Sequence, residues 1–237
     1  MSLKKESRTD VQFHLAALRG DCERLKQLLD TGKVHIDSRD RDGTTPLILS
    51  AAMGHTECVR ELLAQGADPA CSRTTGTTAL FFAAQGGFLD IACLLLDAGA
   101  AIDAPSTDGG TPLFVACQCG HLSVVEELIR RGANVNSCMK DGATPLFKAA
   151  HKGHAAVVAE LLRHDPELGL LPNGQSALHG AAMFGQLACV RQLARRASRD
   201  VPAPTRLRNA SGLTPLQAAA AAGKRDVVAY LRSLEHT

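Results

Sequence analysis

The sequence predicts an all-α repeat solenoid of seven helix-turn-helix units. The first observation behind this prediction is a period: Gly43, Gly76, Gly109 and Gly142 lie 33 residues apart, and each opens a similar phrase. The second is that each phrase is followed by two short helical patterns separated by a glycine. The third is composition, because aromatic residues make up only 3% of the chain. A core of Leu, Ala and Val suits thin stacked layers.

Six copies of the opening phrase are explicit: Gly43-Thr-Thr-Pro-Leu47, Gly76-Thr-Thr-Ala-Leu80, Gly109-Gly-Thr-Pro-Leu113, Gly142-Ala-Thr-Pro-Leu146, Gly174-Gln-Ser-Ala-Leu178 and Gly212-Leu-Thr-Pro-Leu216. A seventh unit is marked by the segment 13–20, which matches the later half of the phrase. We therefore divide the chain into a tail, 1–9, and a single array, 10–237. The predicted units are 10–39, 40–72, 73–105, 106–138, 139–170, 171–208 and 209–237.

The first helix of each unit begins at the Thr of the phrase. The hydroxyl of Thr45 or Thr111 can cap free backbone N–H groups, and the following Pro fits the first helical position. A glycine comes nine residues after the cap, at Gly54 and Gly120 for example, where a left-handed residue ends a helix. The first helix is therefore only about two turns long.

A second helix follows in each unit, with apolar spacing such as Val124, Val125, Leu128 and Ile129. It ends near a glycine such as Gly132. Neither helix is stable alone at this length, so the pairs must stack and bury their apolar faces against their neighbours.

Three phrases recur in register: Thr-Pro-Leu-x-x-Ala-Ala, Gly-His and Gly-Ala-Asn-Val-Asn, the last ending at Asn136. In these phrases the sequence resembles the ankyrin-repeat family over essentially its whole length. The resemblance implies an ankyrin solenoid, a curved stack of L-shaped units joined by β-hairpin loops. Within the family, the segments 4–6, 78–85 and 173–179 are similar to those of a repeat-only member, which implies a protein without a catalytic domain.

Departures from the pattern carry information. The His of the usual Thr-Pro-Leu-His, present at His14 and His179, is replaced by Phe81, Phe114 and Phe147, which we interpret as core rings. An exposed aromatic binding face is the alternative. The array is irregular towards its end, because the step from Gly142 to Gly174 is 32 residues and the next step is 38. The insertion, 195–208, is rich in charge and Pro and predicts an exposed loop without helix.

Bulk properties exclude several partner classes. The net charge of +2 and pI of about 8.2 favour neither nucleic acid nor an anionic membrane. The apolar stretches fall short of the ~20 residues of a membrane span, and the amino terminus resembles no signal peptide. We expect a monomer in the cytoplasm or nucleus, with its eight cysteines reduced.

Two clusters look like metal ligands. Cys117, Cys119 and His121 lie close in sequence, as do His151 and His154. Aligned by repeat, however, His121 and His154 occupy the same framework Gly-His position, and a closed zinc site needs four converging ligands. The sequence contains no nucleophile, paired-carboxylate or phosphate-loop motif. We therefore predict no metal, no cofactor and no enzyme activity.

Two residues are candidates for modification. Asn136 has a spacing similar to that of ankyrin-repeat asparagines hydroxylated by the oxygenase that inhibits hypoxia-inducible factor. The structural alternative is that its side chain only satisfies hairpin backbone groups. Ser198 follows Arg195 and Arg196 and resembles a basic-directed kinase site, with a solvated loop as the alternative.

The binding surface is predicted from the positions that the repeat does not need for its own fold. They should line the concave groove and the hairpin tips: Arg41, Thr44, Met53, Thr74, Thr77, Gln85, Thr107, Gln118, Lys140, His151, Lys152, Met183 and Phe184. Lys140, His151 and Lys152 predict a basic patch, and Phe184 an exposed apolar anchor. We expect a partner protein whose segment carries acidic residues beside an apolar one.

The predicted function is that of a non-catalytic interaction module or scaffold that binds another protein. The alternative is a regulatory inhibitor that masks an enzyme or a transcription factor. Both functions use the same groove, so the sequence alone does not separate them.

Overall fold

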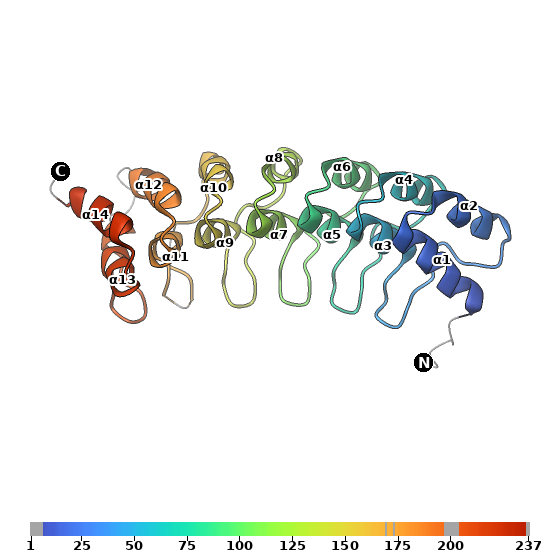
Figure 1. The fold of residues 1–237 in the computed structure, drawn as a ribbon, viewed down its shortest axis with the longest axis horizontal. Coiled ribbons are helices and arrows are strands. Elements are labelled where there is room, and N and C mark those ends of the chain that lie inside the picture. The colour runs from blue at the N-terminus through green and yellow to red at the C-terminus, as the bar shows by residue number, and fades with distance from the viewer. Residues whose placement is uncertain (1–6, 169, 173, 197–203, 236–237) are drawn as a thin grey trace.

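The computed structural model describes residues 7–168, 170–172, 174–196 and 204–235. These residues form fourteen α-helices in consecutive pairs and two 3-10 turns (Figure 1). The helices are α1 (Arg8–Arg19), α2 (Cys22–Asp30), α3 (Pro46–Ala52), α4 (Thr56–Ala64), α5 (Ala79–Gly86), α6 (Leu89–Asp97), α7 (Pro112–Cys119), α8 (Leu122–Arg130), α9 (Pro145–Lys152), α10 (Ala155–Leu161), α11 (Ala177–Phe184), α12 (Leu187–Arg196), α13 (Pro215–Ala221) and α14 (Arg225–Ser233). The turns are η1 (Leu162–His164) and η2 (Pro204–Arg206).

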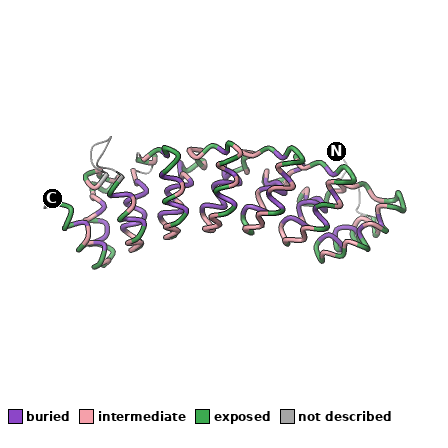
Figure 2. The backbone as a smooth tube through the Cα atoms, turned by 90° about the horizontal axis from the view of Figure 1, so that it is seen from above, coloured by how far each residue is buried: buried purple, intermediate pink, exposed green. Residues whose placement is uncertain are grey.

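The helices stand in two rows. The first helix of each pair, from α1 to α13, packs against the first helix of the next pair and forms the inner row. The second helices form the outer row, and long loops project from the inner row away from it (Figure 1). Seen from above, the pairs follow one another along an elongated, gently curved stack (Figure 2). The predicted fold class, an all-α repeat solenoid, is confirmed.

The helix caps form where the sequence places them. The side chain of Thr45 accepts the N–H of Ile48 at 3.3 Å, and Pro46 begins the helix. At the end of α7, Gly120 is left-handed with φ 82°. A Cβ at this glycine would lie 2.5 Å from the His154 ring, so the position needs glycine both for its backbone and for the approach of the next repeat.

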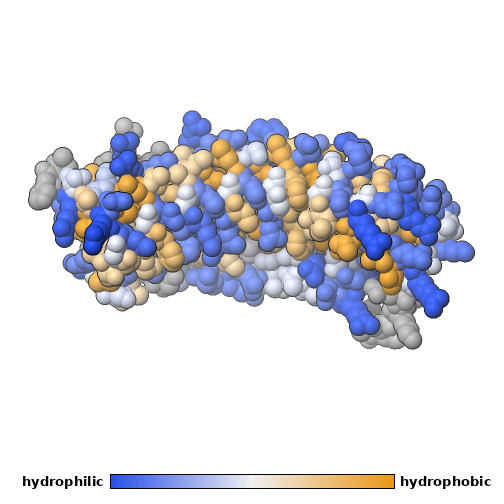
Figure 3. Space-filling view, viewed as in Figure 1, coloured by the Kyte–Doolittle hydropathy of each residue, from blue (hydrophilic) through white to orange (hydrophobic). Residues whose placement is uncertain are grey.

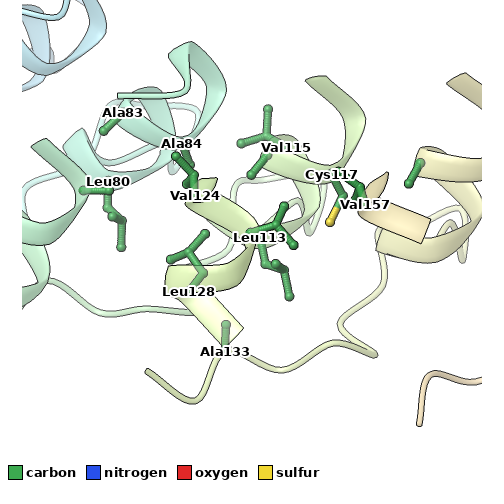
Figure 4. Packing of buried hydrophobic residues seen from close by; sticks show 14 of the residues in the cluster. Leu80, Ala83, Ala84, Leu113, Val115, Cys117, Val124, Leu128, Ala133 and Val157 are labelled. Atoms are coloured by element: carbon green, nitrogen blue, oxygen red, sulfur yellow. The ribbon is translucent and has the colours of Figure 1, made fainter. Parts of the chain in front are cut away.

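The core runs unbroken along the stack as thin layers. Leu80 and Leu113 of the inner row and Leu95 and Leu128 of the outer row are fully buried. Small side chains such as Ala84 let neighbouring helices approach closely (Figure 4). Each pair therefore buries its apolar faces against the next pair, and stability comes from these interfaces.

The framework histidines link successive repeats. Nε2 of His55, His121 and His154 lies 3.0 Å from the backbone oxygen of Leu18, Gln85 and Gln118 respectively, each in the preceding unit. The recurring Gly-His phrase therefore joins one inner helix to the next.

Hydrogen bonds also join successive loops. The N–H groups of Thr74, Thr107 and Lys140 each donate to the preceding loop, with N–O distances of 2.8 Å to the oxygens of Asp42, Thr75 and Asp108. The residue at this position in the next loop is Pro172, which has no N–H. This row of bonds is therefore interrupted at Pro172.

The loops are hairpin turns with almost no strand character. Within the described residues the one β-bridge is Ser72 with Thr78, and no strand forms. The loops close instead through two main-chain bonds each, such as Asp40 N–H to the Thr44 oxygen and Gly43 N–H to the Asp40 oxygen, both at 3.0 Å.

Two local expectations differ from the structure. Helix α1 begins at Arg8, inside the predicted tail, because Ser7 and Asp10 form a capping box. The insertion 195–208 was predicted to lack helix, which is wrong at both ends. Helix α12 extends to Arg196, and Pro204 starts η2, a position at which proline tolerates its missing N–H. The segment 197–203 lies outside the described residues.

Two further observations concern membrane crossing and the end of the second helix in the fifth unit. None of the helices in the described ranges is long and apolar enough to cross a membrane. Asp165 replaces the glycine that ends other second helices and is left-handed, with φ 47°.

Candidate functional site

Most of the predicted binding residues are accessible on the inner helices and loops. Arg41, Met53, Thr74, Gln85, Thr107, Lys140, Lys152 and Phe184 are exposed, and Gln118, His151 and Met183 are half-buried. The remaining two, Thr44 and Thr77, are buried.

Thr44 requires a correction, because it belongs to the loop interior. Its N–H donates to the Asp40 carboxylate at 2.7 Å, and its backbone oxygen accepts from Asp40 N–H. The same oxygen lies 3.1 Å from Nε2 of His14. Only 5% of Thr44 is exposed, so it closes the turn and offers almost no surface to a partner.

Four other predicted residues lie together in one depression between α5, α7 and their loops. Thr77, Gln85, Thr107 and Gln118 line this depression of about 230 Å³. Three apolar side chains, Phe81, Phe114 and Met139, also line it, and Asp108 adds a carboxylate. The depression has room for one large side chain of a partner.

Of the three Phe residues that replace the usual His, two are core residues and one lines the depression. Phe114 and Phe147 are buried in one small cluster with Ala143, as the core interpretation predicts. Phe81 is half-buried and lines the depression. Phe114 and Phe147 therefore fit the interpretation as core rings, whereas Phe81 fits the interpretation as part of an accessible binding face.

A row of rings leads from this core to the surface of the fifth and sixth units. The His151 ring stacks on Phe147, with centroids 6.1 Å apart, and contacts the Phe184 ring at 4.0 Å. Gly180 makes room for the row, because a Cβ there would lie 3.1 Å from the Phe147 ring. Phe184 is 48% exposed, so a supported aromatic ring faces solvent.

The predicted basic patch differs in composition from the expectation. Burial lowers the pKa of His151, and the charges of Lys148 and Lys152 lower it further, so the ring is neutral at neutral pH. Lys140 lies in the loop before α9, whereas Lys152 ends this helix. The cations that act on His151 are therefore Lys148 and Lys152, four residues apart on α9.

Sequence reasoning missed Lys148. Its counterparts in the other units are apolar or small, such as Leu49, Phe82 and Val115. A lysine at this position is the signal that could have identified it.

The cysteines and framework histidines do not converge. Cys117 is fully buried, while His121 and His154 contact backbone oxygens of the preceding unit. Among the residues with described positions, no group of three or more His, Cys, Asp or Glu side chains is placed to hold a metal ion. Burial raises the pKa of the Cys58 thiol to about 12 and that of Cys189 to about 11, which keeps both thiols protonated.

Of the two candidate modification sites, Asn136 lies in a described loop and has a hydrogen-bond partner. The side-chain oxygen of Asn136 accepts Glu167 N–H of the next unit at 2.9 Å. This is the structural role expected of a hairpin asparagine, and hydroxylation remains a prediction. Ser198 lies outside the described residues.

Comparison with known proteins agrees with this architecture. The family model described as ankyrin repeats (3 copies) matches residues 13–106, 99–171 and 157–236. Ankyrin repeat domain-containing protein 29 of Homo sapiens is 50% identical over 68 residues, which are 29% of this chain and 23% of the relative. Its Danio rerio counterpart is 46% identical over 68 residues, with the same shares of the two chains. DNA-binding protein RFXANK of Homo sapiens is 41% identical over 59 residues, 25% of this chain and 23% of the relative.

The match thus spans less than a quarter of these relatives' length, 23% in each case. The family model, by contrast, covers the chain almost from end to end, between residues 13 and 236. From these matches and the paired-helix stack, we conclude that the chain belongs to the ankyrin-repeat family.

Proposed function

We propose that this chain is a non-catalytic interaction module that binds an extended segment of another protein along its inner helices and loops. Ankyrin repeats are protein–protein interaction modules. The observation that carries the proposal is the exposed Phe184 ring, supported by His151 and Phe147. The repeat fold does not need an aromatic side chain at this position, because the counterparts in other units include Met53 and Gly86.

A supported ring is a good anchor for binding. Its rotamer is already restricted by the contact with His151, so little side-chain entropy is lost when a partner covers it. Aromatic side chains in such settings often dominate the energy of an interface. An apolar side chain of the partner would pack against Phe184.

The charges beside Phe184 favour an acidic partner. Neither Lys148 nor Lys152 forms an ion pair with another described residue. An acidic side chain of the partner can therefore pair with them without displacing an existing bond. The depression lined by Phe81 and Phe114 provides a second anchor, two units nearer the N-terminus.

The test begins by isolating a partner with wild-type protein and then measures the affinity of the purified pair. We expect Phe184→Ala and Lys152→Glu each to weaken binding by more than about 1 kcal/mol. The controls are Leu234→Ala, since Leu234 is 37% exposed and follows the outer-row helix α14, and Lys33→Glu, which reverses an exposed charge in the first unit. Both controls should bind as wild type does, and circular dichroism should be unchanged in all four variants.

If both test variants bind with wild-type affinity, the groove assignment is wrong. The inhibitor role uses the same surface and adds one requirement. The captured partner must then be an enzyme or transcription factor that loses activity when bound.

A further inference from the structure

Helix α1, at the N-terminal end of the stack, carries an apolar stripe on its outward side. Val11, Leu15 and Leu18 are 42%, 39% and 39% exposed. Their spacing of four and then three residues places them on one side of the helix, opposite the buried Phe13. Figure 3 shows hydrophobic atoms beside hydrophilic ones at this end of the molecule.

In the next unit, the counterpart of Val11 is the fully buried Thr45, and the counterpart of Leu15 is the half-buried Leu49. Helix α3, which contains Leu49 and is capped by Thr45, packs against α1. Helix α1 therefore presents a surface of the kind that receives a neighbouring helix elsewhere in the stack.

Arginine side chains lie along one side of the stripe, which we call its flank. At 100° per residue, Arg8 and Arg19 both lie on the same side of the stripe, and both are exposed. Arg24 of α2 reaches this flank, because its guanidinium donates to the side-chain oxygen of Gln12 on α1 at 3.1 Å. No described acidic residue forms an ion pair with any of the three arginines.

The acidic side chains nearby have other partners. Asp10 accepts from Ser7 in the capping box of α1. Asp21 accepts the N–H of Arg24 at the start of α2, and Glu23 lies 3.9 Å from Lys26. None of these three carboxylates forms an ion pair with Arg8, Arg19 or Arg24, so the three guanidinium groups are available to an acidic partner.

We propose that this surface, Val11, Leu15 and Leu18 with Arg8, Arg19 and Arg24, docks one amphipathic α-helix of another protein. Apolar residues of that helix, at the same four-and-three spacing, pack on the stripe, and its acidic residues face the arginines. A second copy of this chain fits less well. A two-fold pairing of antiparallel α1 helices would place one arginine flank against the other.

The probe for this proposal is a synthetic amphipathic helix about five turns long, with Leu at the matching spacing and Glu on one flank. Its binding to the full chain is measured by fluorescence anisotropy. We expect Leu15→Asp to weaken binding at least about tenfold, equivalent to about 1.4 kcal/mol. Arg19→Glu should weaken it about fivefold, and a peptide with Lys in place of Glu should bind about fivefold less tightly.

The matched control is Leu234→Asp, because Leu234 is 37% exposed and lies at the opposite end of the stack. Equal affinity of Leu15→Asp and wild type, equal affinity of the two peptides, or no binding of the glutamate peptide would overturn the proposal. A dimer in light scattering that Leu15→Asp abolishes would identify a second copy as the occupant and would also overturn it.

This surface is independent of the groove. Phe184→Ala should bind the peptide as wild type does, and its failure to do so would assign the peptide to the groove instead. Conversely, if the variants at Phe184 and Lys152 disprove the proposed function, the proposal for helix α1 still stands on its own test.

Discussion

At the scale of single residues, His179 joins two repeats at a buried position. Nδ1 lies 2.8 Å from the Ser176 hydroxyl, and Nε2 lies 3.0 Å from the backbone oxygen of Leu213 in the next unit. Burial lowers the pKa of His179 below its ordinary 6.5, although its backbone hydrogen bonds oppose the shift. The folded state thus favours the neutral ring.

This pKa shift predicts a loss of stability in mild acid. Below pH 6.5 the unfolded chain takes up a proton at His179 more readily than the folded chain, so the free energy of unfolding falls with pH. The loss is complete once the pH passes the lowered folded pKa. His179→Gln removes the titration, and Gln217 fills the same capping role in the last unit. In denaturant titrations at pH 7.5 and pH 5, the variant should lose less stability than wild type; an equal loss would refute the assignment.

Asn136 provides a second prediction at this scale. Asn136→Ala removes the acceptor for Glu167 N–H and should lower the free energy of unfolding by about 1 kcal/mol. Asn136→Asp keeps an oxygen at this position, as Asp37 and Asp103 do in other units, and should be milder. The control is Ser137→Ala in the same loop. Urea unfolding measures all three variants, and equal stability of Asn136→Ala and wild type would contradict the role.

The sequence predicted residue roles well where the repeat imposes them. The caps at Thr45 and Thr111 and the glycine at Gly120 follow from backbone geometry, which every copy of the phrase repeats. The lowered pKa of His151 was not predictable, because it depends mainly on burial, which arises from packing between the fifth and sixth units. Burial of Thr44 was missed for a similar reason, since its partners depend on how the loop closes.

At the scale of elements, an ion-pair group links α6 and α8 on the outer row. Glu127 accepts from Arg130 at 2.6 Å and from Arg131 at 2.7 Å, and Arg131 also binds Asp97 of the preceding unit. Hydrogen bonds from Arg130 and then Arg131 lower the pKa of Glu127 to about 2. Only 14% of the Glu127 side chain is exposed, whereas most surface carboxylates are hydrated.

Glu127→Gln should therefore destabilise the protein by about 0.5–1 kcal/mol at neutral pH. The wild-type contribution is present above pH 4.5 and is lost as the pH falls towards 2, because the folded pKa lies below the unfolded one. Glu126→Gln is the matched control, since Glu126 is exposed and has no ion pair among the described residues. Thermal melts at low salt compare the two variants; equal melting temperatures would show that the group adds nothing.

Elements were easier to predict than the connections between them. The helices recur because capping residues and apolar spacing are local properties of the sequence. The loops were expected as β-hairpins. Each described loop closes through two main-chain bonds at its turn, and further bonds join it to the neighbouring loop; the bonds between loops depend on how the units stack. The extension of α12 to Arg196 was also missed, because alanine and arginine continue a helix until another feature stops it.

At the scale of the whole molecule, the insertion between the sixth and seventh units remains the predicted weak point for proteolysis. The segment 195–208 contains five arginines and two prolines. Limited trypsin digestion should cut first within this segment and leave an N-terminal fragment of about six units. Mass spectrometry of the fragments identifies the site. First cleavage inside the first four units, residues 10–138, would contradict the prediction.

The overall architecture was predictable because each interface repeats its neighbour. Once the period and the helix pair are known, stacking determines the rest. The candidate site was predictable only in part. The exposure of Phe184 followed from its position in the repeat, while Lys148 and the stripe on α1 are features of single units that no period reveals.

The missing N–H of Pro172 has a mechanical consequence. From the second to the fifth unit, main-chain bonds join each loop to the preceding one, so we expect these loops to resist separation together. Between the fifth and sixth units the loops lack that bond, while α9 and α11 remain packed. Under bending or tension, the solenoid would open first on its loop side at this joint and pivot about the two helices. Phe184 lies on α11 at this joint, so a partner bound there would bridge the fifth and sixth units and hold them together.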